Sequence, residues 1–309
     1  MNRSTGPAAT RSAGAVLAAA LAIGLGACGS SSTSGSQPPA GSTGTEQSPA
    51  SAVTPTFEID AVEGMKYQLP AGTAPAGAVK VTLVNKDEDM AHEAEMFRLH
   101  AGVTPAQFRT ALLSAAGVGA AAQLSDAAGG PAAIGPGHSD AVTTVLQPSS
   151  TYMVICEIPG MDGKPHYQHG MITSFTTGST GAAKVPAAGD NRVVLKDFSF
   201  TPSAAVDWSK PVQVVNQGTQ PHQMQVFGAA PGKTLADVET YLKAPPGTAP
   251  AGPPPYLAYG GVSAMAPGAS QLADLSLPPG SYLLVCFVDD PTTHLPHFMM
   301  GMQLPITVT

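Results

Sequence analysis

One sequence pattern occurs twice in this chain and limits its fold more than any other feature. The second copy is Cys286-Phe-Val-Asp-Asp-Pro-Thr-Thr-His-Leu-Pro-His-Phe-Met-Met-Gly-Met302, and the first is Cys156-Glu-Ile-Pro-Gly-Met-Asp-Gly-Lys-Pro-His-Tyr-Gln-His-Gly-Met171. Each copy follows an apolar, strand-like run and ends in Pro-His-x-x-x-Gly-Met. The copies lie about 130 residues apart, which is too long for a solenoid repeat and indicates the duplication of a whole domain.

The composition favours many short strands rather than long helices. Gly and Pro account for 34 and 30 of the 309 residues, and both residue types favour turns. Apolar and alternating runs between them, as at 79–85, are typical of strands. Short helices are expected after Thr104 and Thr234, where a capping residue is followed by Gln107 or Asp237 at the capping-box position.

These patterns predict an all-β fold class with two Greek-key β-sandwich domains in tandem, each carrying a short helical insertion. The domains are expected at residues 55–177 and 192–309. The segment between them, 178–191, is small, polar and contains Pro, so we interpret it as a linker. A chain of this length can hold two domains of ordinary size.

The N-terminus is expected to direct export. Residues 1–28 contain two Arg and then a short apolar run, which is typical of a signal peptide. The segment Leu25-Gly-Ala-Cys28-Gly resembles a bacterial lipobox, which implies that Cys28 becomes the lipid-modified first residue. The alternative is an ordinary signal peptide with an incidental Cys. Residues 29–54 are rich in Ser, Gly, Thr and Pro and are expected to form a flexible tether.

Together these features predict a protein that is anchored by lipid to the extracytoplasmic face of the cell membrane. The charge balance excludes one class of partner. Lys and Arg number 14 against 21 Asp and Glu, which gives a formal net charge of −7. Nucleic-acid binding depends on Lys and Arg contacts with phosphates, so no nucleic-acid partner is expected.

Each half supplies the same residue types in the same order: a distant His, then Cys, His and Met near the end. Two imidazoles and one thiolate form the trigonal plane of a type 1 copper site, and a thioether is its weak axial ligand. A loop between neighbouring strands can present the last three residues together, while another strand brings the first His. The predicted ligands are His92, Cys156, His166 and Met171 in the first half, and His222, Cys286, His297 and Met302 in the second.

Both halves resemble cupredoxins, the blue copper domains of the plastocyanin and azurin type. In the second half the resemblance lies in Asn216-Gln-Gly-Thr-Gln-Pro-His222, in Gly280-Ser-Tyr-Leu-Leu-Val-Cys286 and in the His-x-x-x-Gly-Met ending. The first half has the same ending but lacks the Pro before its first His, at Met90-Ala-His92. The resemblance implies a tandem cupredoxin-like lipoprotein with copper in one or both domains. Such a protein would carry electrons or handle copper, and its partner would be a redox or copper-exchange protein.

The loop length departs from familiar blue copper proteins, in which only a few residues separate the Cys from the second His. Here nine residues lie between Cys156 and His166, and ten between Cys286 and His297. The added residues either bulge outward as a turn, which leaves the ligands together, or displace the His.

Three residues near the predicted ligands are possible additional metal ligands, namely His169, His294 and Met300. Each also has an ordinary interpretation. The two histidines are equally consistent with solvated surface residues, and the Met is consistent with apolar filler beside the site.

Tandem cupredoxins also occur in multicopper oxidases and copper nitrite reductases, which need a His beside the Cys to join their copper centres. The residues that flank Cys156 and Cys286 are Ile, Glu, Val and Phe. The sequence contains no Gly-x-Ser-x-Gly, no His-Glu-x-x-His and no complete phosphate-binding Gly-x-x-x-x-Gly-Lys-Ser/Thr loop. We therefore expect that the protein is not an enzyme.

Two other functions stay open from the sequence. The domains could be metal-free structural or interaction modules in which Cys and His pack as core residues. Alternatively, the run Met299-Met-Gly-Met302 could hold Cu(I) in a copper store or chaperone, because thioethers favour the monovalent ion.

Overall fold

The computed structural model describes residues 54–181, 184–244 and 252–309. The predicted signal peptide with Cys28, nearly all of the tether that follows it and two residues of the predicted linker lie outside the described residues. In the described ranges, no helix has the length and apolar character needed to cross a membrane.

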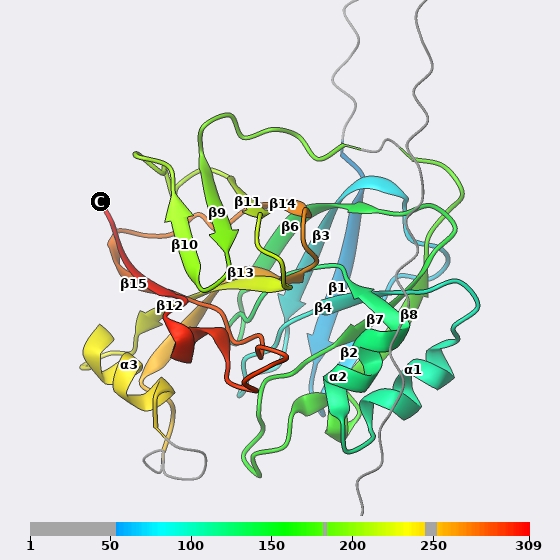
Figure 1. The fold of residues 1–309 in the computed structure, drawn as a ribbon, viewed down its shortest axis with the longest axis horizontal. Helices are drawn as coiled ribbons and strands as arrows, with labels where there is room; N and C mark the ends of the chain where they lie inside the picture. The colour runs from blue at the N-terminus through cyan, green and yellow to red at the C-terminus, as the bar shows by residue number, and fades with distance from the viewer. Residues whose placement is uncertain (1–53, 182–183, 245–251) are drawn as a thin grey trace, which may run out of the picture. The chain divides into compact units, whose positions relative to one another are not determined.

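The same order of eight strands occurs in both halves, with helices inserted after the fourth strand of each (Figure 1). The first half contains β1 (Thr56–Val62), β2 (Lys66–Gln68), β3 (Gly77–Asn85), β4 (Glu95–Leu99), α1 (Pro105–Leu112), α2 (Gly117–Ala121), η1 (Ala122–Leu124), β5 (Ser125–Ala127), β6 (Ser139–Leu146), β7 (Thr151–Ile155), η2 (His166–His169) and β8 (Ile172–Thr176). The second half contains β9 (Arg192–Lys196), β10 (Ser199–Pro202), β11 (Val212–Asn216), β12 (His222–Ala229), α3 (Leu235–Leu242), β13 (Tyr256–Met265), β14 (Ser270–Ala273), β15 (Gly280–Val285), η3 (His297–Met300) and β16 (Gln303–Val308).

Each half is a sandwich of two sheets with matching strand order. The first half has β2-β1-β3-β6 facing β5-β4-β7-β8, and the second has β10-β9-β11-β14 facing β13-β12-β15-β16. In both, the first and third strands of the half pair in parallel, as β1 with β3 and β9 with β11, while the other neighbours are antiparallel. The predicted fold class of two tandem β-sandwiches is therefore confirmed.

One sheet from each half joins into a continuous sheet of eight strands. Strand β6 pairs antiparallel with β14, with Val142 opposite Ala273 and Thr143 opposite Leu272. Val142 and Ala273 occupy the same place in the two repeats, because each lies three residues after Ser139 or Ser270, the residues that pair with Val84 and Val215. The halves therefore meet around a local two-fold relation, and each covers the exposed edge of the other.

A second seam repeats this symmetry. The backbone bridges are Ala128 to Met265, Pro131 to Val262, and Ile134 to Tyr259. Gly130 and Gly261 stand at this seam and pack tightly against their own halves, since a Cβ atom would lie 2.2 Å from the oxygen of Ala94 and 1.9 Å from that of Met224. Both glycines also have positive φ, of 116° and 135°. Glycine is the residue type that tolerates such approach and such a backbone angle.

The predicted helical insertions are present. Thr104 caps α1 and Thr234 caps α3, and in each case a full capping box forms with the side chain of Gln107 or Asp237. The helices lie outside the sandwiches, and each packs in a small apolar cluster of its own. Phe108 of α1 belongs to the cluster of the first half, and Val238 of α3 belongs to that of the second. The Cys and Met residues of the predicted ligand sets belong instead to the main core.

Candidate metal centres

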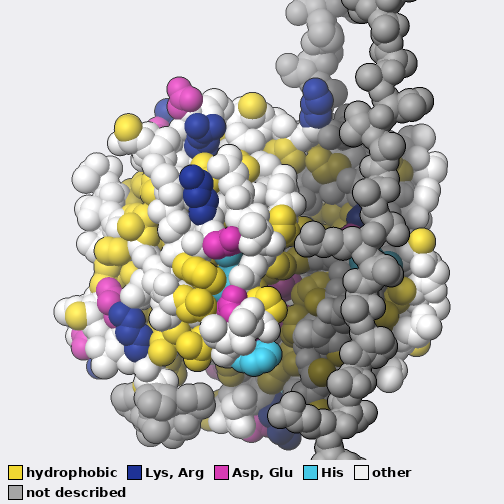
Figure 2. Space-filling model, in the orientation of Figure 1, with side chains coloured by type: hydrophobic (Ala, Val, Ile, Leu, Met, Phe, Trp, Pro, Cys, Tyr) yellow, Lys and Arg dark blue, Asp and Glu magenta, His cyan; other side chains and the backbone are white. Residues whose placement is uncertain are grey.

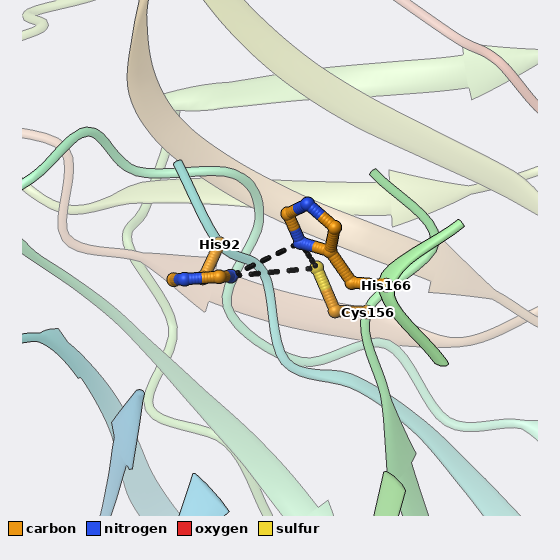
Figure 3. Close-up of side chains that lie close together, drawn as sticks. All are labelled: His92, Cys156 and His166. Atoms are coloured by element: carbon orange, nitrogen blue, oxygen red, sulfur yellow. Dashed lines mark hydrogen bonds between the residues drawn. The ribbon is translucent and has the colours of Figure 1, made fainter. Parts of the chain in front are cut away.

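The first group of predicted ligands comes together at the end of the first sandwich. Cys156 follows β7 directly, His92 lies just before β4, and His166 opens η2. The Cys156 sulfur lies 3.4 Å from Nδ1 of His166 and 3.9 Å from Nδ1 of His92, and the two Nδ1 atoms are 3.2 Å apart (Figure 3). All three residues are buried, with at most 1% of their surface exposed.

The second group repeats this geometry. The Cys286 sulfur lies 3.4 Å from Nδ1 of His297 and 4.0 Å from Nδ1 of His222, and the two Nδ1 atoms are 3.0 Å apart. These three residues are fully buried. Figure 2 shows few histidine side chains on the visible face, in keeping with this burial.

The triangles fit a metal ion. With bond lengths of roughly 2.0–2.1 Å to imidazole nitrogen and about 2.3 Å to thiolate sulfur, three ligands around one ion lie about 3.5–3.8 Å apart. The observed edges of 3.0–4.0 Å bracket that range. Within the described residues, these two groups are the ones in which at least three ligand atoms converge. Two imidazoles and one thiolate are the donor set of a copper site.

The predicted axial residues are fixed by the backbone of the other ligands. The N–H of Met171 donates to the carbonyl of His166 at 3.1 Å, and the N–H of Cys156 donates to the carbonyl of Met171 at 3.3 Å. Met302 makes the same two bonds, at 3.0 and 3.2 Å. Both Met side chains are fully buried in the same core cluster as the Cys residues. Cys, His and Met are thus held together by a short ring of backbone hydrogen bonds.

The added residues between Cys and His form outward turns. In the first loop the N–H of His166 donates to the carbonyl of Ile158 at 2.9 Å, and Pro159 and Pro165 form a bridge. The turn between them places Met161 fully in solvent. In the second loop, His297 N–H donates to Val288 in the same way. The alternative in which the longer loop displaces the His is not what the structure shows.

The possible additional ligands do not join either group. His169 Nε2 lies 3.0 Å from Oδ1 of Asp162 on the surface turn. His294 is exposed, with a φ of 56°. The sulfur of Met300 accepts a weak hydrogen bond from the hydroxyl of Thr293 at 3.6 Å. The ordinary interpretations of these residues, as surface histidines and apolar filler, agree with these positions.

Hydrogen-bond partners behind the ligands were missed by the sequence analysis. His222 Nε2 lies 2.9 Å from Oδ1 of Asp197, and His297 Nε2 lies 3.0 Å from Oε1 of Gln220. In the first centre, Oδ2 of Asp87 lies 3.3 Å from Nε2 of His92, a charge contact in which neither atom makes a hydrogen bond. Such partners fix the ring orientation of metal-binding His and leave the other nitrogen free as a ligand. Asp197 stands far from its His in sequence, so no local motif indicates it.

Burial determines the protonation state of the His and Cys side chains in the absence of a metal ion. Burial and the neighbouring His lower the pKa of His166 and of His297 to about 4, so both rings are neutral near pH 7. Burial raises the pKa of Cys286 to about 12 and moves the pKa of Cys156 in the same direction. A metal ion therefore binds at imidazoles that are already deprotonated and must displace one thiol proton.

Carboxyl groups lie beside both centres: Asp197 and Asp290 at the second, and Glu93 and Glu157 at the first. Glu93 Oε1 accepts a hydrogen bond from the N–H of Glu157 at 2.8 Å, and its Oε2 accepts one from Nε2 of Gln225 at 3.1 Å across the boundary between the halves. In the second half, Gln223 Oε1 accepts the equivalent bond from the N–H of Phe287. Burial raises the pKa of Glu93 to about 7 and that of Glu157 to about 8.

Comparison with known proteins gave matches among solved structures. No family model and no curated protein matches the chain. A reduced auracyanin from Roseiflexus castenholzii has 23% identity, with 40% of this chain and 97% of that chain covered at a TM-score of 0.28. Auracyanin A, a blue copper protein from Chloroflexus aurantiacus, has 22% identity with the same coverage and TM-score. A multicopper oxidase has 12% identity, covering 82% of this chain and 88% of that chain, at a TM-score of 0.25.

Each half of the chain is a two-sheet β-sandwich that holds one buried group of two His and one Cys able to hold a metal ion. One expectation needs correction. The sequence analysis expected that the protein is not an enzyme, from the absence of His beside the two Cys. The match to a multicopper oxidase over 82% of the chain overturns that expectation, and we withdraw it.

Proposed function

We propose that the protein carries electrons at the extracytoplasmic face of the cell membrane, with copper bound by both halves and a lipid anchor on Cys28. The observation that supports this most strongly is the repetition of one buried triangle of two Nδ1 atoms and one sulfur. Its edges differ by no more than 0.2 Å between the halves. A ligand set that is built before the metal arrives needs little rearrangement when the metal changes its oxidation state.

In this proposal the two His and the Cys of each half are the strong ligands, and Met171 and Met302 are the axial ones. Copper, when bound, supplies a one-electron couple. The chain supplies the rest: Asp87, Asp197 and Gln220 orient the imidazoles, and burial keeps water away from the sulfur. The partner is a redox protein or a protein that exchanges copper.

Copper storage as Cu(I) is the second candidate, and it has less support. It would use the Met-rich run near the C-terminus, but Met299 is 46% exposed and the sulfur of Met300 bonds to Thr293. Only Met302 of that run is buried beside Cys286. A metal-free module has less support as well, because three ligand atoms face one another in each half rather than separate partners in the core.

A copper titration followed by absorption tests the proposal. Copper(II) added to the purified protein should give an intense visible band from the thiolate, saturating at two ions per chain. Cys156→Ser and Cys286→Ser should each remove one ion and part of the band. A colourless protein that retains no copper after desalting would overturn the proposal, and tight Cu(I) binding without the band would favour storage.

The anchor is tested separately in cells. Growth with a labelled fatty acid should label the wild-type protein and leave it in the membrane fraction. Cys28→Ala should remove the label and release the protein from the membrane. Retention of the label in that variant would contradict lipid attachment at Cys28.

A further inference from the structure

A cleft with a volume of about 600 Å³ lies at the boundary between the two halves. Strands β4, β5, β6 and β7 line it from the first half, and β11, β14 and the turn before β14 line it from the second. Lys184 and Val185, from the segment between the halves, complete the lining. None of the predicted metal ligands belongs to it. A cleft of this volume can hold a small molecule.

The cleft coincides with a difference between the halves at one position. Ala128 and Tyr259 are equivalent, since they lie six residues before Ile134 and Met265, respectively. The local two-fold relation exchanges the bridge from Ala128 to Met265 with the bridge from Ile134 to Tyr259. A methyl group in the first half thus stands where the second half has a phenol ring.

The phenol ring of Tyr259 fills the equivalent place in the second half. It packs edge-on against Tyr282, with ring centroids 5.0 Å apart, and a Cβ atom at Gly228 would lie only 2.7 Å from it. The counterparts of Tyr282 and Gly228 are Tyr152 and Arg98, and both of these line the cleft. The open space of the first half is therefore the space that a ring occupies in the second.

The charged residues that line the cleft are two cations and one carboxylate. Arg98 forms an ion pair with Asp126, whose other oxygen lies 3.2 Å from Nε2 of His100. Lys184 is exposed and makes no ion pair within the described residues. In a chain with a net charge of −7, the cleft carries a surplus of positive charge.

Several polar groups inside the cleft are already bonded to one another. The side-chain amide of Gln271 donates to the carbonyl of Ala128 at 2.7 Å and to the hydroxyl of Thr144 at 2.9 Å. The side-chain amide of Gln213 donates to the hydroxyl of Ser270 at 3.1 Å. Small apolar side chains make up much of the remaining lining, namely those of Ala127, Ala128, Val145, Val185, Ala266 and Ala269.

We propose that the cleft binds a small organic anion with an apolar body and one carboxylate or sulfonate group. The body lies against the alanine side chains, because burial of apolar surface favours binding. The anionic group faces Lys184 and the guanidinium N–H groups of Arg98 that Asp126 leaves free, since a guanidinium has five donors. This site is separate from the predicted copper ligands and goes beyond the proposed function.

A fluorescence titration of the purified full chain tests the proposal. Anilinonaphthalene sulfonate, an apolar anion that fluoresces when it leaves water, should bind saturably at one molecule per chain. Benzoate should displace it. Benzyl alcohol, a neutral molecule of nearly the same size, should displace it less well, because it lacks the charge. Added salt should weaken the binding of both anions and leave that of the alcohol unchanged.

Substitutions locate the site. Ala128→Tyr, combined with Arg98→Gly, gives the cleft the residues that the second half has at these positions, and it should weaken binding of the probe by about tenfold or more. Lys184→Gln should weaken binding of the anions by about two- to fivefold and leave that of benzyl alcohol unchanged. Lys243→Gln, at an exposed lysine beside the end of α3, is the matched control and should change neither.

Absence of saturable binding, or binding that none of the cleft substitutions weakens, would overturn the proposal. Weakening by Ala128→Tyr with Arg98→Gly alone would keep the site and overturn its preference for an anion. If circular dichroism shows that this double variant does not fold, Lys184→Gln decides, because it changes only an exposed side chain. A smaller preference for benzoate over benzyl alcohol in Lys184→Gln supports the proposal, and an unchanged preference overturns it.

Discussion

The two metal centres place a carboxyl group behind the first His from different parts of the fold. In the first, Asp87 follows β3 and its fully buried carboxyl lies beside Nε2 of His92. In the second, the turn between β9 and β10 supplies Asp197, and Gly218 stands where the first half has Asp87. A Cβ at Gly218 would lie only 2.4 Å from the Asp197 carboxyl. An acceptor behind the first His is therefore present in both halves, although its source differs.

The largest effect is expected from the ligands themselves. Cys156→Ser should abolish copper binding in the first half and leave the second half loaded, because a hydroxyl is a poor ligand for copper beside a thiolate. Cys286→Ser should do the reverse. Metal analysis after desalting checks both, and loss of both ions in either variant would show that the centres are not independent.

The acceptors behind the His residues come next. Asp197→Asn should weaken copper binding at the second centre by about 10- to 100-fold, since loss of a partner behind a ligating His has effects of that size. The first centre, which has Asp87, should be unchanged. Competition with a chelator in the Cys156→Ser and Cys286→Ser backgrounds separates the two.

A swap sharpens the same comparison. Asp197→Gly combined with Gly218→Asp moves the carboxyl of the second half to the position it has in the first. A Cβ at Gly218 would lie 2.5 Å from Nε2 of His222, so the imidazole must shift and little of the affinity lost in Asp197→Asn should return. Full recovery would mean that the presence of a carboxyl, and not its position, is what matters at this centre.

Much of the fold and the ligand set follows from the sequence, because the repeat places each Cys, His and Met on a short loop after a strand. The hydrogen-bond partners Asp197 and Gln220 could not be predicted from the sequence, since they reach the site from loops that carry no motif of their own. The joint sheet also escaped prediction. Nothing in the sequences of β6 and β14 marks them as partners, and the local two-fold relation emerges only from their register.

The seam between the halves offers a comparison of stability. Asp140 accepts hydrogen bonds from the N–H groups of Ala132 and Gly261, and its counterpart Gln271 accepts one from Gly130. Asp140→Ala should lower the free energy of unfolding by about 1–3 kcal/mol, because buried N–H groups lose their partner. Gln271→Ala should cost about the same, and chemical denaturation measures both. A neutral result for both would show that the seam contributes little.

A smaller effect concerns pH in the copper-free protein. Burial raises the pKa of Asp140 to about 8, as it raises those of Glu93 and Glu157, so the folded state holds protons that the unfolded state has released. The unfolding free energy should therefore fall as pH rises from about 6.5 to 8, by at most about 1.4 kcal/mol per pH unit for each group. His166 and His297 have the opposite effect on the unfolding free energy, because their lowered pKa values leave the folded state with fewer protons than the unfolded state. Their contribution rises with pH, but only below about pH 6.5. Denaturation at several pH values checks the slope, which Asp140→Asn should reduce.

The smallest effect is expected at the added turns. Met161→Ala should change neither stability nor copper binding beyond about 0.5 kcal/mol, because the side chain is fully exposed. Calorimetry and a copper titration measure both quantities. A marked loss of copper would show that the turn takes part in the first centre.

The central claim is that each half binds one copper ion through two imidazoles and one thiolate. X-ray absorption at the copper edge of the fully loaded protein tests it most directly, because it reports the atoms bound to copper. The account predicts two ions per chain, each with one sulfur and two imidazole nitrogens at bonding distance, and loss of half of the sulfur signal per chain in Cys156→Ser. Copper bound only by nitrogen and oxygen, or fewer than two ions per chain, would contradict it.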